Sequence, residues 1–350
     1  MAERIFLTPV AVTGRRAAPE SALPLAGSAL RFGACEVAGR SAAAPDRVRR
    51  ETLSIPDLVR VEGARDWLAA LSAPRAEIDG LTFDRCHVMG VLNVTPDSFS
   101  DGGDRIDPGR AVADGLAMWE AGATILDVGG ESTRPGAEPV AEDEELRRVL
   151  PVVRGLAEAG ARVSIDTRHA RVMREAVQAG ARMVNDVTAL TGDAASLETV
   201  RELGVPAVLM HMQGEPPTMQ DQPQYTDVVA EVRQFLNERI SACERAGIPR
   251  ERLILDPGLG FGKTDAHNLR LLARLDELGL QDRPLLVGFS RKGTLGRLLD
   301  RGVDERLAGS LAVAVLAAER GARIVRAHDV CETRDVLRVT QAVRNAGESE

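Results

Sequence analysis

The sequence predicts an α/β protein whose main part is a (β/α)8 barrel, the TIM barrel fold. From about His87 onward, short apolar runs that end in a polar residue alternate with amphipathic helical segments. Such alternation indicates a parallel sheet, and eight units over about 260 residues match the usual size of a (β/α)8 barrel. An open doubly wound sheet is the alternative, although it usually has fewer strands and a single crevice.

Each predicted strand is a short apolar run, and glycine often ends the helix before it. The predicted strands are residues 87–93, 124–127, 163–166, 183–186, 207–210, 253–256, 285–288 and 323–326. Helices are expected at 108–121, 142–159, 169–179, 193–203, 227–246, 266–278, 294–299, 305–320 and 334–344. Polar residues stand at the strand ends. A barrel would gather them at one mouth, whereas an open sheet would scatter them.

Residues 1–84 have weaker periodicity and form a predicted N-terminal extension to a barrel of residues 85–345, which a tail at 346–350 follows. Residues 28–37 can form a strand and 56–71 a helix. Residues 77–83, with Asp79-Gly80 at their centre, are typical of a tight hairpin. Because this hairpin directly precedes the first barrel strand, we expect it to close the bottom of the barrel. The sequence assigns no function to the rest of the extension.

The composition excludes several classes of function. A net charge of −8 and a pI near 5.4 argue against general nucleic-acid binding, and no apolar run approaches the roughly 18 residues of a membrane span. Four dispersed cysteines are typical of reduced thiols, so we expect a cytoplasmic protein. Of 44 basic residues, only Lys263 and Lys292 are lysines, and arginine does not replace lysine where a compact ammonium must fit.

Asp166, Asn185 and Asp256 stand at the ends of three predicted strands. A carboxylate accepts two parallel N–H bonds from an amidine-like edge, and an amide both donates and accepts. Together these groups suit a flat heterocycle with a mixed hydrogen-bonding edge. The alternative for each aspartate is a cap of the next helix, and Asp166 before Thr167 fits that role too.

A second group of residues carries positive charge. Arg134 follows two glycines in the loop after the second strand, Lys292 precedes a helix after the seventh, and Arg326 and His328 follow the eighth. Phosphate groups frequently bind near strands seven and eight of this fold, so these cations favour an anionic substrate. The absence of a Ser-His-Asp or Cys-His pattern favours departure of a phosphorylated leaving group over attack by a protein nucleophile.

Two loops at the predicted mouth are distinctive. Residues 93–103, NVTPDSFSDGG, are polar and long for a strand-to-helix connection, as lids often are. Residues 256–264, DPGLGFGKT, fail the phosphate-loop pattern because only three residues separate Gly258 from Gly262. Their glycines allow the loop to pass over a flat ring with Phe261 against it, unless Phe261 belongs to the core. We expect His211 to be a packing residue.

Eight motifs, in order, resemble those of the dihydropteroate synthases, enzymes of the folate pathway that sulfonamides inhibit. The first two are MGVLNVTPDSFSDGG at 89–103 and DVGGESTRPG at 127–136. The others are SIDT at 164–167, VND at 184–186, MHMQG at 210–214, DPG at 256–258, SRK at 290–292 and RAHD at 326–329. The resemblance covers about residues 85–345 and leaves the extension outside it.

This resemblance implies a transferase that condenses 6-hydroxymethyl-7,8-dihydropterin diphosphate with 4-aminobenzoate to give 7,8-dihydropteroate and diphosphate. By similarity, the pterin contacts are Asp127, Asp166, Asn185, Asp256 and Lys292. The diphosphate contacts are Asn93, Arg134, Arg326 and His328, with Mg²⁺ bridging Asn93 to the diphosphate. The aminobenzoate contacts are Thr133, Pro135, Phe261 and Ser290. Asp97 and Asp101, which assist Mg²⁺ or the cationic centre, complete the catalytic set with Arg326.

Two rivals stay open at this stage. A pterin-binding methyltransferase barrel shares the carboxylate and amide positions but needs no diphosphate site, and a non-catalytic paralogue would bind pterin or another protein. We expect small-molecule substrates, no nucleic-acid partner and no membrane. A homodimer through barrel helices would match the family, although nothing in the sequence shows it. Lys263 has no predicted role beyond its place in the loop.

Overall fold

A closed parallel barrel forms most of the molecule. The computed structural model describes residues 5–13, 19–25, 31–41, 44–95, 107–132, 139–215, 218–278 and 283–346. Within them, eight parallel strands close in the order β10-β11-β12-β5-β6-β7-β8-β9. They are β5 (His87–Asn93), β6 (Ile125–Gly129), β7 (Val163–Asp166), β8 (Met183–Asp186), β9 (Ala207–Met210), β10 (Leu253–Asp256), β11 (Leu285–Gly288) and β12 (Ala322–Ala327). The predicted barrel is confirmed, and the open-sheet alternative is wrong.

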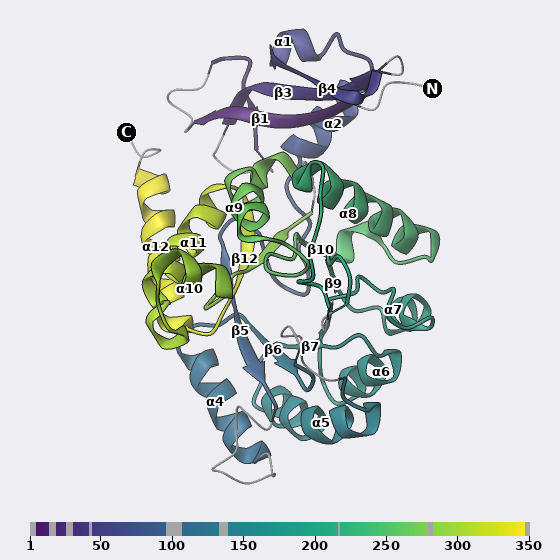
Figure 1. The fold of residues 1–350 in the computed structure, drawn as a ribbon, viewed down its shortest axis with the longest axis vertical. Helices are drawn as coiled ribbons and strands as arrows, with labels where there is room; N and C mark the ends of the chain where they lie inside the picture. The colour runs from purple at the N-terminus through teal and green to yellow at the C-terminus, as the bar shows by residue number, and fades with distance from the viewer. Residues whose placement is uncertain are drawn as a thin grey trace.

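Helices surround this barrel (Figure 1). They are α4 (Pro108–Glu120), α5 (Glu142–Glu158), α6 (Ala170–Gln178), α7 (Ser196–Leu203), α8 (Val228–Arg245), α9 (Asp265–Ala273), α10 (Gly293–Leu299), α11 (Leu307–Glu319) and α12 (Val330–Ala346). Asp227 and Thr264 begin α8 and α9 by accepting main-chain N–H groups. The predicted helix 266–278 is divided into α9 and a 3-10 helix, η3 (Leu275–Leu278). The last helix begins at Val330 rather than at 334.

The barrel interior is filled by a layer of apolar side chains. Alternate residues of each strand point inward, and seven of the eight strands, all except β7, supply one residue each to this layer. Its members are Met89, Ile125, Met183, Val208, Ile254, Leu286 and Ile324. Each side chain of this size stabilises the fold by about 1.5–3 kcal/mol when it is fully buried. The layer separates the bottom of the barrel from its mouth.

A tight hairpin closes the bottom of the barrel, as predicted. Ile78 and Leu81 exchange main-chain hydrogen bonds of 3.1 and 2.9 Å. Asp79 and Gly80 form the turn with φ angles of 49° and 75°, the left-handed values that a two-residue hairpin turn requires. Ile78, Leu81 and Phe83 pack against the apolar layer. The hairpin is therefore part of the barrel core.

Two arginines fasten the hairpin to the barrel. Arg162, just before β7, donates from Nε to Asp79 Oδ2 at 2.8 Å. Arg182, just before β8, donates from Nη2 to Asp79 Oδ1 at 2.5 Å. Both contacts lie at the ends where the strands begin, so they hold the turn across the bottom opening.

Residues 5–72 contain a second, smaller sheet that the sequence largely fails to predict. The central strand β3 (Arg31–Ser41) pairs antiparallel with β1 (Ile5–Thr13), β2 (Leu23–Pro24) and β4 (Ala44–Ser54). The strand predicted at 28–37 overlaps β3, whereas β1 and β4 are not predicted. The single helix predicted at 56–71 is wrong, because α1 (Ile55–Leu58) and α2 (Ala64–Ser72) are separated by a turn that includes Gly63 at φ 77°.

This small sheet and its helices have an apolar core of their own. Its buried members are Leu7, Leu25, Phe32, Cys35, Ile55, Leu58, Ala64, Leu68 and Leu71. Figure 1 shows the sheet as a layer outside the barrel helices, and β1 contacts η3. Since η3 precedes β11, the extension lies at the end where the barrel strands begin, opposite the mouth.

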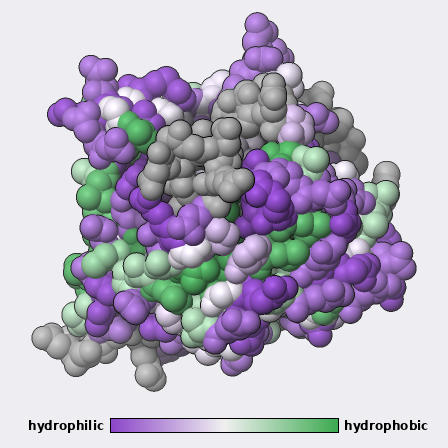
Figure 2. Space-filling view, turned by 90° about the horizontal axis from the view of Figure 1, so that it is seen from below, coloured by the Kyte–Doolittle hydropathy of each residue, from purple (hydrophilic) through white to green (hydrophobic). Residues whose placement is uncertain are grey.

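The surface is mixed in character. The face seen in Figure 2 carries separate islands of hydrophobic residues among hydrophilic ones. Among the described segments, no helix is both long and apolar enough to cross a bilayer. The four cysteines are free thiols.

Candidate active site

The polar residues of the mouth lie directly above the apolar layer of the barrel. On four strands, a polar residue follows the apolar inward residue by two positions. The pairs are Ile125 with Asp127, Met183 with Asn185, Ile254 with Asp256, and Ile324 with Arg326. Because side chains alternate along a strand, this spacing keeps both members of each pair on the inward face. The strand period therefore brings the carboxylates, the amide and the guanidinium together.

Arg326 joins the carboxylates of two strands. Its Nε donates to Asp127 Oδ2 at 2.6 Å, and its Nη2 donates to Asp166 Oδ2 at 2.7 Å. Asn185 Nδ2 donates to the same Asp127 oxygen at 2.9 Å. The fork of a guanidinium matches two acceptors, and such charge-assisted bonds are about twice as strong as neutral ones. Arg326, expected beside the diphosphate, thus lies among the carboxylates expected to hold the heterocycle.

Burial and charge oppose each other in this cluster. Burial raises the pKa of Asp166, and Asp127 adds to the rise while Arg326 opposes it. Burial also works against the charge of Arg326, but the two carboxylates outweigh it and raise the pKa of the guanidinium. Asp127 is fully buried, and its Oδ1 has no hydrogen-bond partner among the described residues. A ligand edge that donates N–H groups would satisfy that oxygen.

Asp256 supplies a third carboxylate to the mouth. Its Oδ1 accepts the main-chain N–H of Gly258 at 2.7 Å, and burial raises its pKa to about 6. The alternative that these aspartates cap helices is wrong. Thr264 caps α9, and Asp166 binds Arg326 while His169 occupies the N-cap position of α6.

Phe261 lies between an apolar cluster and the ammonium of Lys292. The residue is 8% exposed and packs with Val187 and Met210. Lys292 Nζ lies 4.0 Å from the ring centroid, within the range of a cation–π contact. A Cβ added at Gly260 would lie 3.2 Å from Lys292 Cδ, so the glycine leaves the lysine stem room to pass. Phe261 is thus a core residue on one side and a partner of the lysine on the other.

Lys263 and His211 form a buried connection that the sequence does not predict. Lys263 Nζ lies 2.9 Å from His211 Nδ1, 3.3 Å from the His211 carbonyl oxygen, 2.9 Å from that of Gly258 and 3.0 Å from that of Phe261. Burial lowers the pKa of His211 to about 3, with Lys263 adding to the effect, so the neutral ring accepts at Nδ1. The one signal in the sequence is the retention of lysine in an arginine-rich chain.

His211 also packs, as predicted. Its ring makes an edge contact with Phe235 at a centroid distance of 4.9 Å. The connection to Lys263 is therefore an addition to the packing role.

Asn93 and His328 line a common hollow, whose other walls come mainly from α4 and the start of α12 beside the barrel. The hollow has a volume of about 560 Å³, and Met118 and Val330 also line it. The main-chain N and the ring Nδ1 of His328 lie 3.2 and 3.1 Å from Ser290 Oγ. Burial lowers the pKa of His328 to about 4, and Arg326 adds to the effect. His328 is therefore neutral near pH 7 and would contact an anion as a hydrogen-bond donor rather than as a cation.

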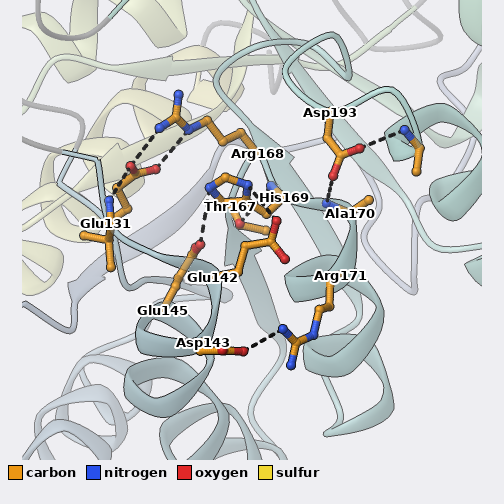
Figure 3. A network of polar contacts seen from close by, with 12 residues as sticks. Glu131, Glu142, Asp143, Glu145, Thr167, Arg168, His169, Ala170, Arg171 and Asp193 are labelled. Carbon is orange, nitrogen blue, oxygen red and sulfur yellow. Dashed lines mark hydrogen bonds and ion pairs between the residues drawn. The ribbon is translucent and has the colours of Figure 1, made fainter.

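The loops after β6 and β7 are tied together beside this site, as Figure 3 shows. Arg168 donates from Nε and Nη2 to the two carboxylate oxygens of Glu131 at 3.1 and 2.9 Å. Glu131 Oε1 also accepts the main-chain N–H of Val140 at 3.2 Å. Glu131 thus holds Val140 beside it, and through Arg168 it links the loop between β6 and α5 to the end of β7.

Glu145 of α5 lies in the same network, buried close to that loop. Its carboxylate oxygen lies 4.0 Å from His169 Nε2, and burial raises its pKa to about 7. A Cβ at Gly130 would lie 3.0 Å from Glu145 Cγ. The sequence does not single out Glu145, because acidic residues are common in the first turn of a helix.

Ten of the predicted site residues are described, and all lie at carboxyl ends of strands or in the loops that follow. They are Asn93, Asp127, Asp166, Asn185, Asp256, Phe261, Ser290, Lys292, Arg326 and His328. Asp97, Asp101, Thr133, Arg134 and Pro135 lie outside the described residues, so their roles stay predictions.

A closed (β/α)8 barrel with carboxylates, an amide and an arginine at the carboxyl ends of its strands defines a class, the (β/α)8 barrels with a polar site in the mouth. The family described as pterin binding enzyme matches residues 89–328. The dihydropteroate synthase of Escherichia coli (strain K12) is 51% identical over 276 residues, which cover 79% of this chain and 98% of that relative. Two solved structures from Xanthomonas albilineans are also similar.

The first is a dihydropteroate synthase with 4-aminobenzoic acid, with a TM-score of 0.73 and 52% identity over 77% of this chain and 98% of that chain. The second is a dihydropteroate synthase in complex with 7,8-dihydropteroate, with a TM-score of 0.69 and 50% identity over 75% of this chain and 95% of that chain. The chain belongs to the dihydropteroate synthase family and is a transferase.

Proposed function

We propose that this chain joins 6-hydroxymethyl-7,8-dihydropterin diphosphate to 4-aminobenzoate, releasing diphosphate and forming 7,8-dihydropteroate for folate synthesis. The observation that carries the proposal is the Arg326 bridge between Asp127 and Asp166 in the barrel mouth. It builds a rigid polar wall for a flat heterocycle and sets a cation where an anionic group can approach. The two similar Xanthomonas albilineans structures support this reaction, because one is with 4-aminobenzoic acid, a proposed substrate, and the other is in complex with 7,8-dihydropteroate, the proposed product.

The pterin edge would face the carboxylates and the amide. Asp256 and Asp127 would accept N–H groups of the heterocycle, because Asp127 Oδ1 is buried without a described partner. Asn185 already donates to Asp127 Oδ2, so its carbonyl oxygen is oriented by that bond. Lys292 would donate to a ring acceptor, with Phe261 holding the lysine from one side.

The diphosphate would lie beside Asn93 and His328, which line the same hollow. The oxygen donors available beside Asn93 suit Mg²⁺, because magnesium is commonly bound by few protein oxygens together with substrate phosphate oxygens. Asn93 would supply the protein oxygen, and no cluster of three acidic, histidine or cysteine ligands exists among the described residues. The bound ion would neutralise charge on the departing diphosphate. Asp97, Asp101 and Arg134 are proposed to assist from the neighbouring loops.

The 4-aminobenzoate would lie against Phe261, with Thr133, Pro135 and Ser290 around it. An aromatic amine is uncharged near pH 7, so its attack on the pterin methylene carbon needs no strong base. The carbon–oxygen bond to diphosphate breaks, the carbon–nitrogen bond forms, and the amine proton leaves to solvent. Fixed cations favour this step because charge on the leaving group is larger in the transition state than in the substrate.

One assay separates this proposal from its rivals. Diphosphate release should require the pterin diphosphate and 4-aminobenzoate together, and removal of Mg²⁺ with EDTA should reduce it. A methyltransferase would release no diphosphate from this pair. A non-catalytic paralogue would bind the pterin diphosphate, measured by calorimetry, without product formation. Either result would overturn the proposed reaction.

We also propose a cytoplasmic homodimer that binds neither nucleic acid nor membrane. The dispersed free thiols suit a reducing compartment. Val339 and Val343, one turn apart on α12, are 64% and 68% exposed, which suits an apolar contact between barrel helices. Sedimentation equilibrium would test the dimer. Val339→Glu should shift it toward the monomer, and a wild-type protein that is monomeric at micromolar concentration would contradict it.

A further inference from the structure

The carbonyl groups of the loop between β10 and α9 are held from several sides. Lys263 Nζ donates to the carbonyls of Gly258 and Phe261. Gln220 Nε2 donates to the carbonyl of Gly260 at 2.8 Å, and Tyr225 Oη donates to that of Gly262 at 2.8 Å. The loop that carries Phe261 is therefore a fixed surface of the mouth, and Lys263 makes two of these four contacts.

Backbone contacts explain why this loop lies so close to its neighbour. A Cβ at Gly258 would lie 1.9 Å from the carbonyl oxygen of His211, and one at Gly262 would lie 2.2 Å from that of Gln213. The glycines thus allow the loop after β10 to touch the loop after β9. Lys263, 2% exposed, lies at this contact and donates to both loops.

The four neighbours of Lys263 Nζ are all acceptors, namely three carbonyl oxygens and His211 Nδ1. An ammonium offers three protons to such a set from one compact centre, whereas a guanidinium is planar and larger. This requirement accounts for a buried lysine in a chain whose other basic residues, apart from Lys292, are arginines.

The connection leads directly to the ring of Phe261. Lys263 binds the carbonyl of Phe261, and the Phe261 ring supports the ammonium of Lys292 at 4.0 Å. Asp256 lies at the start of the same loop and accepts the N–H of Gly258, whose carbonyl Lys263 holds. Loss of the Lys263 contacts would free the loop to move both Phe261 and the main chain beside Asp256.

We propose that Lys263 is a positioning residue that sets the affinity for the aromatic amine by fixing the main chain that carries Phe261. The inference rests on the proposed function, because 4-aminobenzoate is the ligand expected against that ring. Lys263 acts through Phe261 and does not contact the reacting atoms.

A double-mutant cycle tests this role. Lys263→Met should raise KM for 4-aminobenzoate roughly tenfold, the equivalent of one lost hydrogen bond to a charged group, with a smaller change in kcat. Phe261→Leu should also raise KM, and Lys263→Met should add little in the Phe261→Leu background, because the contact it supports is already gone. Multiplying effects in the double variant would overturn the proposal, as would an unchanged KM in Lys263→Met.

A matched control separates positioning from general destabilisation. Arg233→Met removes another buried cation that donates to a carbonyl, that of Glu277 at 3.0 Å, away from the mouth. It should lower the melting temperature without changing KM for 4-aminobenzoate. An equal rise of KM in this control would show that Lys263 acts only through stability.

A second variant keeps the test decisive if Lys263→Met does not fold. His211→Phe preserves the packed ring but removes the acceptor at Nδ1, so it should raise the same KM about twofold or more, since it weakens one contact of several. No change in KM in this variant, if it folds, would count against the proposal. Absence of product with the wild-type chain would instead contradict the proposed function itself.

Discussion

The ammonium of Lys292 lies 4.0 Å from the centroid of the Phe261 ring, with Gly260 directly beside the lysine stem. This contact joins the loop after β10 to the loop after β11. The lysine stem has little space beside Gly260, which accounts for a lysine here in a chain with 44 basic residues of which 42 are arginines.

Lys292→Arg should therefore damage the site although it preserves charge. The guanidinium is broader than the ammonium and would press on the main chain at Gly260. We expect KM for the pterin diphosphate to rise by about tenfold or more, a loss of roughly 1.4 kcal/mol. Steady-state kinetics measure this, and Arg297→Lys on α10, an exposed ion pair with Asp265, is the control with no expected change. Unchanged KM would contradict the assigned role of Lys292.

Arg326→Ala should weaken binding of the diphosphate and destabilise the fold together. Removal of the guanidinium leaves the buried carboxylates of Asp127 and Asp166 without their shared cation, a change that costs about 3–5 kcal/mol. Calorimetry with pterin diphosphate should show lost affinity, and urea unfolding should show lost stability. Arg326→Lys keeps the charge but loses the fork, so it should fall between the wild type and Arg326→Ala. Full affinity in Arg326→Ala would reject the assignment.

Asp256→Ala should reduce affinity for the pterin ring itself, with or without its diphosphate. The variant removes a buried carboxylate acceptor, and a hydrogen bond to a charged group contributes about 1.5–3 kcal/mol. Because burial raises the pKa of Asp256 to about 6, pterin binding to the wild type should weaken as pH falls below that value. Calorimetry at pH 8 and pH 5 measures both effects. Equal affinity at the two pH values would contradict a carboxylate acceptor at this position.

Glu145→Gln should change the pH dependence of stability. The pKa of Glu145 is raised from 4.5 to about 7 in the folded protein, so between those values the folded state binds more protons than the unfolded state. This contribution to stability is full below pH 4.5 and is lost as pH rises through 7. Relative to the wild type, the variant should therefore gain about 3 kcal/mol between pH 5 and pH 8. Urea unfolding at both pH values measures the difference.

Glu144→Gln is the matched control for that experiment. Its side chain is adjacent in sequence but pairs with Arg147 and Arg148 on the surface, and these bonds lower its pKa. It should show no gain at pH 8. A gain of equal size in both variants would mean that burial of Glu145 is not the cause.

Gly258→Ala should misplace the loop that holds Asp256. Its φ is 65°, and the added Cβ would lie 1.9 Å from the carbonyl oxygen of His211. We expect a loss of about 3 kcal/mol in the free energy of unfolding, at the upper end of overpacking costs. Gly160→Ala is the control, because Gly160 also has a positive φ but nothing within 4 Å of its Cβ. It should cost only about 1–2 kcal/mol, the cost of a left-handed backbone alone, and equal losses would contradict the steric explanation.

The barrel and much of its mouth are predictable because they depend on patterns within short segments, namely apolar runs and the two-residue alternation of side chains along a strand. A strand such as β5 or β10 is a short apolar run, and its boundaries follow from the polar residue that ends it. Asp127 and Arg326 fall on the inward face because they stand two residues after Ile125 and Ile324. The resemblance of the motifs then supplies roles that the period alone does not.

The rest depends on contacts between distant segments. Among the described residues, the long strands β1 and β4 each pair with β3 and with no other strand, so their formation depends on contacts that neither segment shows by itself. The bond between Lys263 and His211 spans 52 residues, and the pairing of Arg326 with both carboxylates depends on the curvature of the closed barrel. Burial of Glu145 follows from packing of α5 against its neighbours, which one helix sequence does not reveal.

The scarcity of lysine allows the mouth to be labelled selectively at an amine. Apart from the α-amino group, the chain has two primary amines, and Lys263 is 2% exposed while Lys292 is partly exposed. An amine-selective reagent such as an activated ester would thus label a single position in the barrel, without mutagenesis. The extent of that labelling, read by mass spectrometry, would report occupancy of the pterin pocket in the native chain.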